Sequence, residues 1–257
     1  MTADRRSAHL DLQGAADALG IHYQTAYRWV RSGKLPAVVV DGHYQLDPHE
    51  VAEVARRREE PARPPAPSPG RVRREAERVH EALIDGDEPA VERSVQRLLA
   101  EGLSATDICQ HVLAPSLRLI GEAWAGGRVT IWVEHRASAI VEVALAGIMP
   151  NPRGRRRGTA VVAALSGDRH ALPTTMATIA LRDDNWRVEQ LGADTPPEEV
   201  LDFCAGRDVD LVVITVTTDE AAVAAWEAAE RLEAEGLTVL IGGPGRSLDE
   251  LVEAARR

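Results

Sequence analysis

The chain has 257 residues, of which 44% are apolar, and its 40 Asp and Glu against 30 Lys and Arg give a formal net charge of −10. This length and composition allow two or three small domains with buried cores. There is no apolar stretch of about 18 residues and no apolar signal core, so we expect a cytoplasmic protein without membrane contact. The two cysteines are far apart, which argues against a disulfide framework or a zinc site.

The charge is unevenly distributed. Residues 1–58 hold eight Lys and Arg against seven Asp and Glu, so the acidity lies in the rest of the chain. Because phosphate binding needs cations, the overall negative charge by itself argues against a nucleic-acid partner. DNA contact by the N-terminal segment would have to be steered locally.

The sequence pattern of residues 11–58 predicts a winged helix-turn-helix. We assign residues 1–58 to this domain. Gly20 permits a tight turn between a first helix and a second helix from Tyr23 to Ser32. A hairpin near residues 38–44, turning at Asp41-Gly42, would form the wing. The order of these elements resembles the MerR/excisionase class, in which the second helix enters the major groove of operator DNA.

Polar side chains of the second helix and the following turn are the candidate DNA contacts, whereas Trp29 and Val30 should pack inward. Arg28 is the first choice for reading a base. The alternative is that Arg28 and Arg31 merely solvate a surface helix. One such module is usually too small for tight binding, so we expect a homo-oligomer, either a dimer or a tetramer. The candidate contacts are Gln24, Thr25, Arg28, Arg31 and Lys34.

The middle of the chain reads as a linker followed by helices. Five prolines between Glu59 and Gly70 exclude a helix interior and predict an extended linker over residues 59–72. Apolar residues then repeat at intervals of three and four, with breaks near residues 85–87, 101–102 and 126–127. This pattern predicts a four-helix bundle over residues 73–152.

After a basic hinge at residues 153–157, short apolar runs alternate with amphipathic helices. The alternation predicts an α/β domain over residues 157–257, with a doubly wound parallel sheet of Rossmann type. The predicted strands are residues 160–165, 188–191, 211–214 and 239–241. The predicted helices lie near residues 174–182, 197–204, 219–235 and 248–255.

The loop after the first predicted strand carries the strongest chemical signal. Asp168 and His170 stand two residues apart at the carboxyl end of a buried strand, where α/β sheets usually bind cofactors. A carboxylate that accepts the Nδ1–H of an imidazole leaves Nε2 free to bind a metal. Upstream, nine residues separate Trp124 from the pair Glu134-His135.

These features, together with the N-terminal module, resemble the cobalamin-dependent, light-sensing transcriptional regulators of the CarH/LitR type over nearly the whole chain. The resemblance implies an Asp/Glu-x-His-x-x-Gly loop in which His170 is the lower axial ligand of cobalt and Asp168 orients it. It also implies that the Thr215 hydroxyl completes this relay. Pro173 stands where the family has glycine and should narrow the loop. The resemblance places Thr217, Gly192, Gly242 and Gly243 along the slot for the nucleotide tail.

The resemblance also implies a cap over the upper face of the cofactor. In light-sensing members a Trp covers a 5′-deoxyadenosyl group with a Glu-His pair nearby, and Trp124, Glu134 and His135 fit this motif in spacing. Glu134 falls on an apolar stripe, where an unpaired carboxylate is costly, so it needs a partner.

The function implied by the resemblance is that of a non-enzymatic, light-responsive repressor with adenosylcobalamin as its chromophore. Photolysis of the cobalt–carbon bond would change the oligomeric state and DNA binding. Two alternatives stay open. One is a regulator that senses haem or another tetrapyrrole, or that has no cofactor. Two residues keep it open: Pro173 replaces the family glycine, and Ala125, rather than a histidine, follows Trp124. The other is a corrinoid methyl-carrier protein, against which the helix-turn-helix argues.

Overall fold

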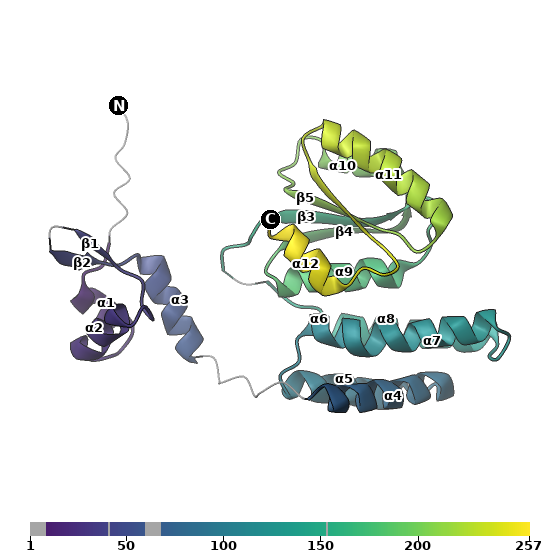
Figure 1. The fold of residues 1–257 in the computed structure, drawn as a ribbon, viewed down its shortest axis with the longest axis horizontal. Coiled ribbons are helices and arrows are strands. Elements are labelled where there is room, and N and C mark those ends of the chain that lie inside the picture. The colour runs from purple at the N-terminus through teal and green to yellow at the C-terminus, as the bar shows by residue number, and fades with distance from the viewer. Residues whose placement is uncertain (1–8, 41, 60–67, 153) are drawn as a thin grey trace. The chain divides into compact units, whose positions relative to one another are not determined.

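The computed structural model describes residues 9–40, 42–59, 68–152 and 154–257, except for the side chains of residues 56–59. It divides into two compact units, residues 1–64 and 65–257 (Figure 1). The turn residue Asp41 and residues 60–67 of the predicted linker lie outside the described residues. In the described part of the chain, every helix is too short or too polar to cross a lipid bilayer.

The N-terminal unit contains three helices and one hairpin. Its core is made largely of alanine and leucine, such as Ala16, Ala26 and Leu46, which allows the helices to approach closely. Gly20 adopts a positive φ of 59° at the turn between the first two helices. The strands pair antiparallel, with Val39 opposite Tyr44. The elements are α1 (Leu12–Ala18), α2 (Tyr23–Arg31), β1 (Val38–Val40), β2 (His43–Gln45) and α3 (Pro48–Glu59).

A helical domain begins the second unit. Its first helix starts at Pro69, inside the predicted linker, because proline is tolerated in the first turn of a helix. The buried carboxylate of Glu75 accepts hydrogen bonds from Arg78 at 2.6 Å and Arg97 at 2.8 Å, and thereby joins the first two helices. The elements are α4 (Pro69–Asp85), α5 (Glu88–Ala100), α6 (Ala105–Ile108), the π-helical η1 (Cys109–Leu113), α7 (Ala114–Ala125) and α8 (Ile131–Gly147).

The third predicted helix is continuous but not regular, since α6, η1 and α7 follow one another without a break. In η1 the N–H of Ala114 bonds the carbonyl of Cys109, five residues earlier. Pro115 explains the wide turn. Proline has no N–H to give to the carbonyl four residues before it, and its ring would clash with that carbonyl in a regular α-helix.

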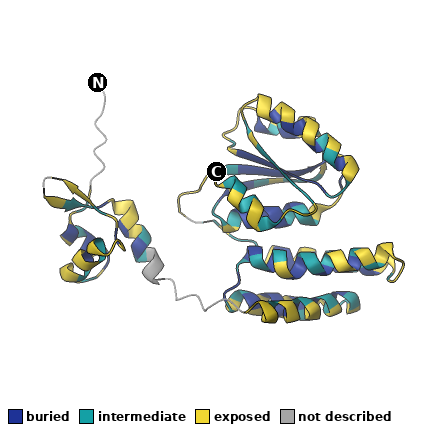
Figure 2. Ribbon diagram, viewed as in Figure 1, coloured by how far each residue is buried: buried dark blue, intermediate teal, exposed yellow. Residues whose placement is uncertain are grey.

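The α/β domain has a parallel sheet in the order β4-β3-β5-β6, with α9 and α12 on one face and α10 and α11 on the other (Figure 1). The central strands β3 and β5 are almost entirely buried (Figure 2), as continuous apolar runs require. The elements are β3 (Thr159–Leu165), α9 (Ala171–Asp183), β4 (Arg187–Thr195), α10 (Pro197–Cys204), β5 (Leu211–Thr215), α11 (Asp219–Ala234), β6 (Thr238–Gly242) and α12 (Leu248–Ala255).

The helical domain packs against the α9 and α12 side of the sheet. Met176 and Ile179 of α9 belong to the apolar core of the helical domain. At the junction, the Thr106 hydroxyl donates to Asp183 at 2.9 Å, and the backbone N–H of Asp249 donates to Gln110 at 3.1 Å. These contacts fix the helical domain against the α9 and α12 face of the sheet.

Candidate cofactor site

Asp168 lies on the loop between β3 and α9 and is completely buried. It accepts hydrogen bonds from the backbone N–H and the hydroxyl of Thr217, both at 2.7 Å. It also accepts from the backbone N–H of His170 at 3.1 Å and lies 2.9 Å from His170 Nδ1. Two loops at the carboxyl end of the sheet are thus joined by one carboxylate.

Burial raises the pKa of Asp168, but the hydrogen bonds from Thr217 and His170 outweigh it and hold that pKa below its usual range. The carboxylate is therefore ionised at neutral pH and accepts the Nδ1–H of His170. Nε2 then carries the free lone pair. The His170 side chain is 63% exposed, so this lone pair is available to a metal outside the loop.

Thr215 does not supply the hydroxyl that we expected on Asp168, and Thr217 does. The Thr215 hydroxyl instead bonds the hydroxyl of Thr174 at 2.9 Å, beneath α9. The register explains the correction. Thr215 is still in β5, opposite Ala164 of β3, whereas Asp168 lies three residues past the end of β3. Its partner must therefore also lie beyond the strand, at Thr217.

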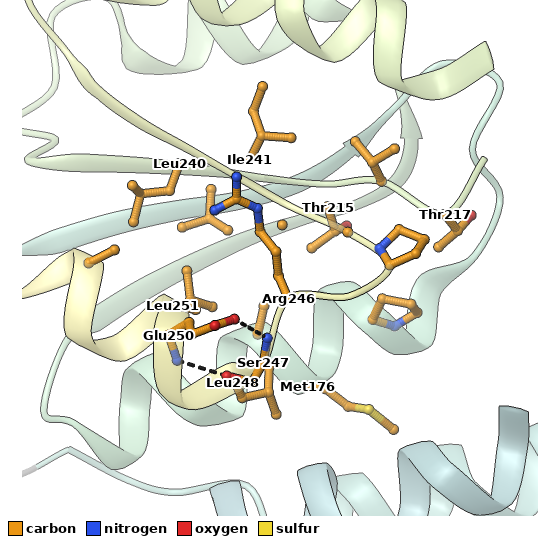
Figure 3. A pocket seen from close by; sticks show the side chains of 18 of the residues that line it. Met176, Thr215, Thr217, Leu240, Ile241, Arg246, Ser247, Leu248, Glu250 and Leu251 are labelled. Atoms are coloured by element: carbon orange, nitrogen blue, oxygen red, sulfur yellow. Dashed lines mark hydrogen bonds between the residues drawn. The ribbon is translucent and has the colours of Figure 1, made fainter. Parts of the chain in front are cut away.

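A pocket of about 650 Å³ opens beside this loop (Figure 3). Thr217, Gly242 and Gly243, which we expected along the slot for the nucleotide tail, line this pocket together with Thr215 and with Pro173 from the first turn of α9. A Cβ at Gly242 would meet no atom within 4 Å and would occupy the pocket, whereas one at Gly243 would sit 3.2 Å from the carbonyl oxygen of Val216. Gly242 therefore lets a ligand approach the backbone, whereas Gly243 lets its own loop lie close to the Val216 carbonyl.

Gly192 does not line this pocket. It lies in β4, paired with Ala163, on the opposite side of β3 from β5 and β6. It has a φ of 94°, so it serves the irregular backbone of an edge strand. Sequence analysis missed Arg246 and Trp226, which do line the pocket. Arg246 could have been found, because a cation three residues after a Gly-Gly pair stands close to the loop that the glycines form.

The three predicted cap residues lie at one end of the helical domain, in the last turn of α7 and the first turn of α8. Trp124 is 46% exposed, although Ile120 on the same stripe is buried. Glu134 accepts a hydrogen bond from Ser138 at 2.9 Å and lies 3.7 Å from His135 Nε2. Among the described residues, no hydrogen bond or ion pair joins these three side chains to the Asp168 loop.

The candidate DNA contacts form one exposed face of α2. Gln24, Arg28 and Arg31 follow each other at intervals of four and three residues, and all are exposed, whereas Thr25 is half-buried. Trp29 and Val30 pack against the core, as predicted. Lys34 is exposed and lies 4.2 Å above the ring of Trp29, so a cation–π contact holds it next to the helix.

Comparison with known families assigns all three regions. Residues 10–59 match a helix-turn-helix domain, residues 75–147 a B12 binding domain, and residues 158–255 a second B12 binding domain model. The chain is a helix-turn-helix protein with B12-binding domains. This confirms the resemblance to cobalamin-dependent regulators and supports cobalamin as cofactor and DNA as partner.

Two HTH-type transcriptional repressors of Myxococcus xanthus are among the relatives. The chain is 32% identical to CarA over 160 residues, which cover 57% of this chain and 51% of CarA. It is 29% identical to CarH over 161 residues, which cover 61% of this chain and 53% of CarH. The chain thus spans about half the length of these relatives. The monomethylamine corrinoid protein of Methanosarcina barkeri aligns with a TM-score of 0.55 and 20% identity over 69% of this chain and 87% of that chain, which supports the fold alone.

Proposed function

We propose that this protein is a transcriptional repressor that binds adenosylcobalamin as a chromophore and responds to light. The Asp168–His170 pair carries the proposal, because it directs an exposed imidazole nitrogen away from a buried carboxylate. When bound, adenosylcobalamin supplies a light-labile cobalt–carbon bond. The similarity to two repressors supports regulation of transcription rather than enzymatic catalysis.

The residues around the loop fit the lower half of a corrinoid. His170 would bind cobalt through Nε2, while Asp168 and Thr217 would hold the ring and its tautomer. A pocket of about 650 Å³ is within the size range of cofactor sites and could receive the nucleotide tail. Pro173 forms part of the pocket wall without blocking it, so the departure from the family glycine is compatible with binding.

The exposed end of the helical domain would meet the upper face. We propose that Trp124 excludes water from the adenosyl group and that Glu134, with His135 beside it, accepts hydrogen bonds from it. Half-exposed positions support this role, because side chains already buried in a core could not contact a ligand. Loss of the adenosyl group would leave an apolar gap that the helices relieve by moving, and this would change the homo-oligomer and its affinity for DNA.

In the N-terminal unit, the face of α2 formed by Gln24, Arg28 and Arg31 would enter the major groove, with Thr25 beside it. The exposed strand β1 and its partner β2 would form the wing. Lys34 would contact a phosphate, because a lysine is a point charge that carries no base specificity.

The cofactor is tested by titrating the full chain with adenosylcobalamin in darkness and recording its absorption spectrum. Wild type should show the spectrum of imidazole-bound cobalamin, and His170→Ala should shift it to the base-off form or abolish binding. His49→Ala removes an exposed histidine of the N-terminal unit and should leave the spectrum unchanged. If His170→Ala gives the wild-type spectrum, the assigned lower ligand is wrong.

DNA binding is tested on selected operator fragments by gel shift. Arg28→Ala should cost about 1–3 kcal/mol and relax preference at one operator position. Lys34→Ala should lower the affinity for all DNA sequences by a similar factor. A chain that binds cobalamin but no DNA would instead be a corrinoid carrier.

A further inference from the structure

The two edges of the parallel sheet are built differently. At one edge, β4 carries charged side chains such as Arg187 and Glu189, shifts register against β3 after Val162, and holds Asp194 at a φ of 56°. At the other edge, β6 pairs with β5 in unbroken register, and its sequence Thr-Val-Leu-Ile-Gly contains no charge. Charges and irregularities are what natural sheets use to prevent edge-to-edge pairing. β4 is protected in this way and β6 is not.

The free edge of β6 presents a defined set of backbone groups. The N–H of Val216 donates to the carbonyl of Gly242, so Gly242 directs its backbone toward β5. Because backbone direction alternates along a strand, Leu240 also faces β5, whereas Val239 and Ile241 face outward. Among the described residues, β5 is the sole strand that pairs with β6. Two N–H and two C=O groups are therefore open to a further strand.

One exposed aromatic side chain of α11 stands next to this edge. Trp226 of α11 is 60% exposed, and Val223, one turn before it, is 62% exposed. Trp226 lines the same pocket as Leu251 of α12 and the β6 residues Leu240 and Ile241. The last three are labelled in Figure 3. An exposed aromatic side chain beside an open strand edge is typical of a contact surface.

We propose that the β6 edge is an interface between two copies of this chain, in which β6 pairs antiparallel with β6 of the partner. With a two-fold axis at Leu240, Val239 lies opposite the partner's Ile241, and Ile241 lies opposite the partner's Val239. These are hydrogen-bonded pairs, so all four outward groups of each strand are satisfied. Leu240 faces the partner's Leu240 as a non-hydrogen-bonded pair. The two four-stranded sheets become one continuous sheet.

Charge favours a second copy over an unrelated strand. Glu233 lies in the last turn of α11, which leads into β6, and Arg246 lies in the loop that follows β6, and both line the pocket. In the described part of the chain, neither side chain forms an ion pair. Antiparallel pairing places the N-terminal end of β6, near Glu233, beside the C-terminal end of the partner's β6, near the partner's Arg246. By symmetry, Arg246 lies near the partner's Glu233. The edge is thus complementary to itself.

A cysteine at the two-fold axis tests the register. In non-hydrogen-bonded antiparallel pairs the Cα atoms are about 4.5 Å apart, close enough for a disulfide. Leu240→Cys should therefore form a covalent dimer under mild oxidation, in darkness and without cobalamin or DNA. Gln190→Cys, exposed on the protected edge strand β4, is the matched control and should stay monomeric on a non-reducing gel. Native thiols should not compete, because Cys109 and Cys204 are buried and burial, with Asp183 nearby, raises the pKa of Cys109 to about 12.

A charge swap tests the same interface without touching the core. Glu233→Arg and Arg246→Glu should each weaken the dimer about fivefold in sedimentation equilibrium, and the double variant should recover. A monomeric wild type, cross-linking at position 190 as strong as at 240, or swaps without effect would each overturn the proposal. Leu240, Glu233 and Arg246 also line the pocket proposed for the nucleotide tail, so these assays use the chain without cofactor. A failed dimer then contradicts the interface alone, and the His170→Ala spectrum tests cobalamin binding separately.

Discussion

The Asp168 loop and the Trp124 end of the helical domain are two halves of one proposed site, but they differ in burial and in the number of contacts that hold their side chains. Asp168 is completely buried and holds two loops together through Thr217 and His170. Glu134 accepts one hydrogen bond from Ser138, a neighbour in its own helix, and Trp124 lies nearly half exposed. The first half is ordered by the chain itself. The second half has few contacts within the chain that would fix its side chains.

This difference separates stability from binding. Residues of the loop contribute to folding and to the orientation of His170, so their loss should reduce both the free energy of unfolding and cofactor affinity. Residues at the end of the helical domain must be ordered when a ligand binds, which costs side-chain entropy at that moment. Their loss should change the response to the ligand and leave folding almost unchanged.

The largest effect is expected from Asp168→Ala. Its removal leaves the partly buried N–H and hydroxyl of Thr217 without their acceptor, so we expect a loss of about 1–3 kcal/mol in the free energy of unfolding, measured with urea. Cobalamin affinity should fall roughly 10–100-fold, because the imidazole is no longer oriented. Asp208→Ala, at an exposed position, should change neither quantity. Equal stability of the two variants would contradict the structural role of the loop.

The same carboxylate should give a pH dependence. Hydrogen bonds hold the pKa of Asp168 below its unfolded value, so its contribution to stability is present at neutral pH and is lost as the pH falls through the folded pKa. Asp168→Asn should flatten this acid limb of the unfolding curve.

An intermediate effect is expected for Thr217→Val. The variant removes one hydrogen bond to Asp168 but keeps the backbone N–H, so cobalamin affinity should fall roughly tenfold. Thr215→Val is the matched control, since its hydroxyl bonds Thr174 instead. It should cost about 1 kcal/mol of stability and lower cobalamin affinity less than Thr217→Val does, because its hydroxyl makes no bond to Asp168. If Thr215→Val lowered cobalamin affinity more than Thr217→Val, the relay through Thr215 that we expected from the sequence would be correct.

The smallest effect on folding is expected for Trp124→Ala, within about 1 kcal/mol, because the side chain is nearly half exposed. The variant should bind adenosylcobalamin through His170 but lose much of the difference in oligomeric state between darkness and green light, measured by size-exclusion chromatography. Trp132→Ala, at a 59% exposed position in α8, should keep that difference. Wild type that elutes identically after photolysis would remove light-driven assembly from the proposed function.

Local sequence patterns predicted the strands and the first half of the site. Continuous apolar runs placed β3 and β5 within one residue, because parallel strands that are buried on both faces have near-continuous apolar sequences. The Asp168–His170 pair was visible because its two members are neighbours in the chain. In contrast, the choice between Thr215 and Thr217 depends on strand register, and the polar ends of β4 at Arg187 and Thr195 give no apolar signal. Strand register depends on residues that are far apart in the chain, so no short segment of the sequence predicts it.

The π-helical turn at Cys109–Leu113 sets the rotational phase between two parts of one helix. Before it, Thr106 is bound to α9 through Asp183, and after it Ile120 is buried in the helical domain and Trp124 emerges from it. An α-helix turns by about 100° per residue, so removing one residue from this turn would rotate everything downstream by that angle. The direction in which Trp124 points is therefore determined by a single surplus residue more than two helical turns away.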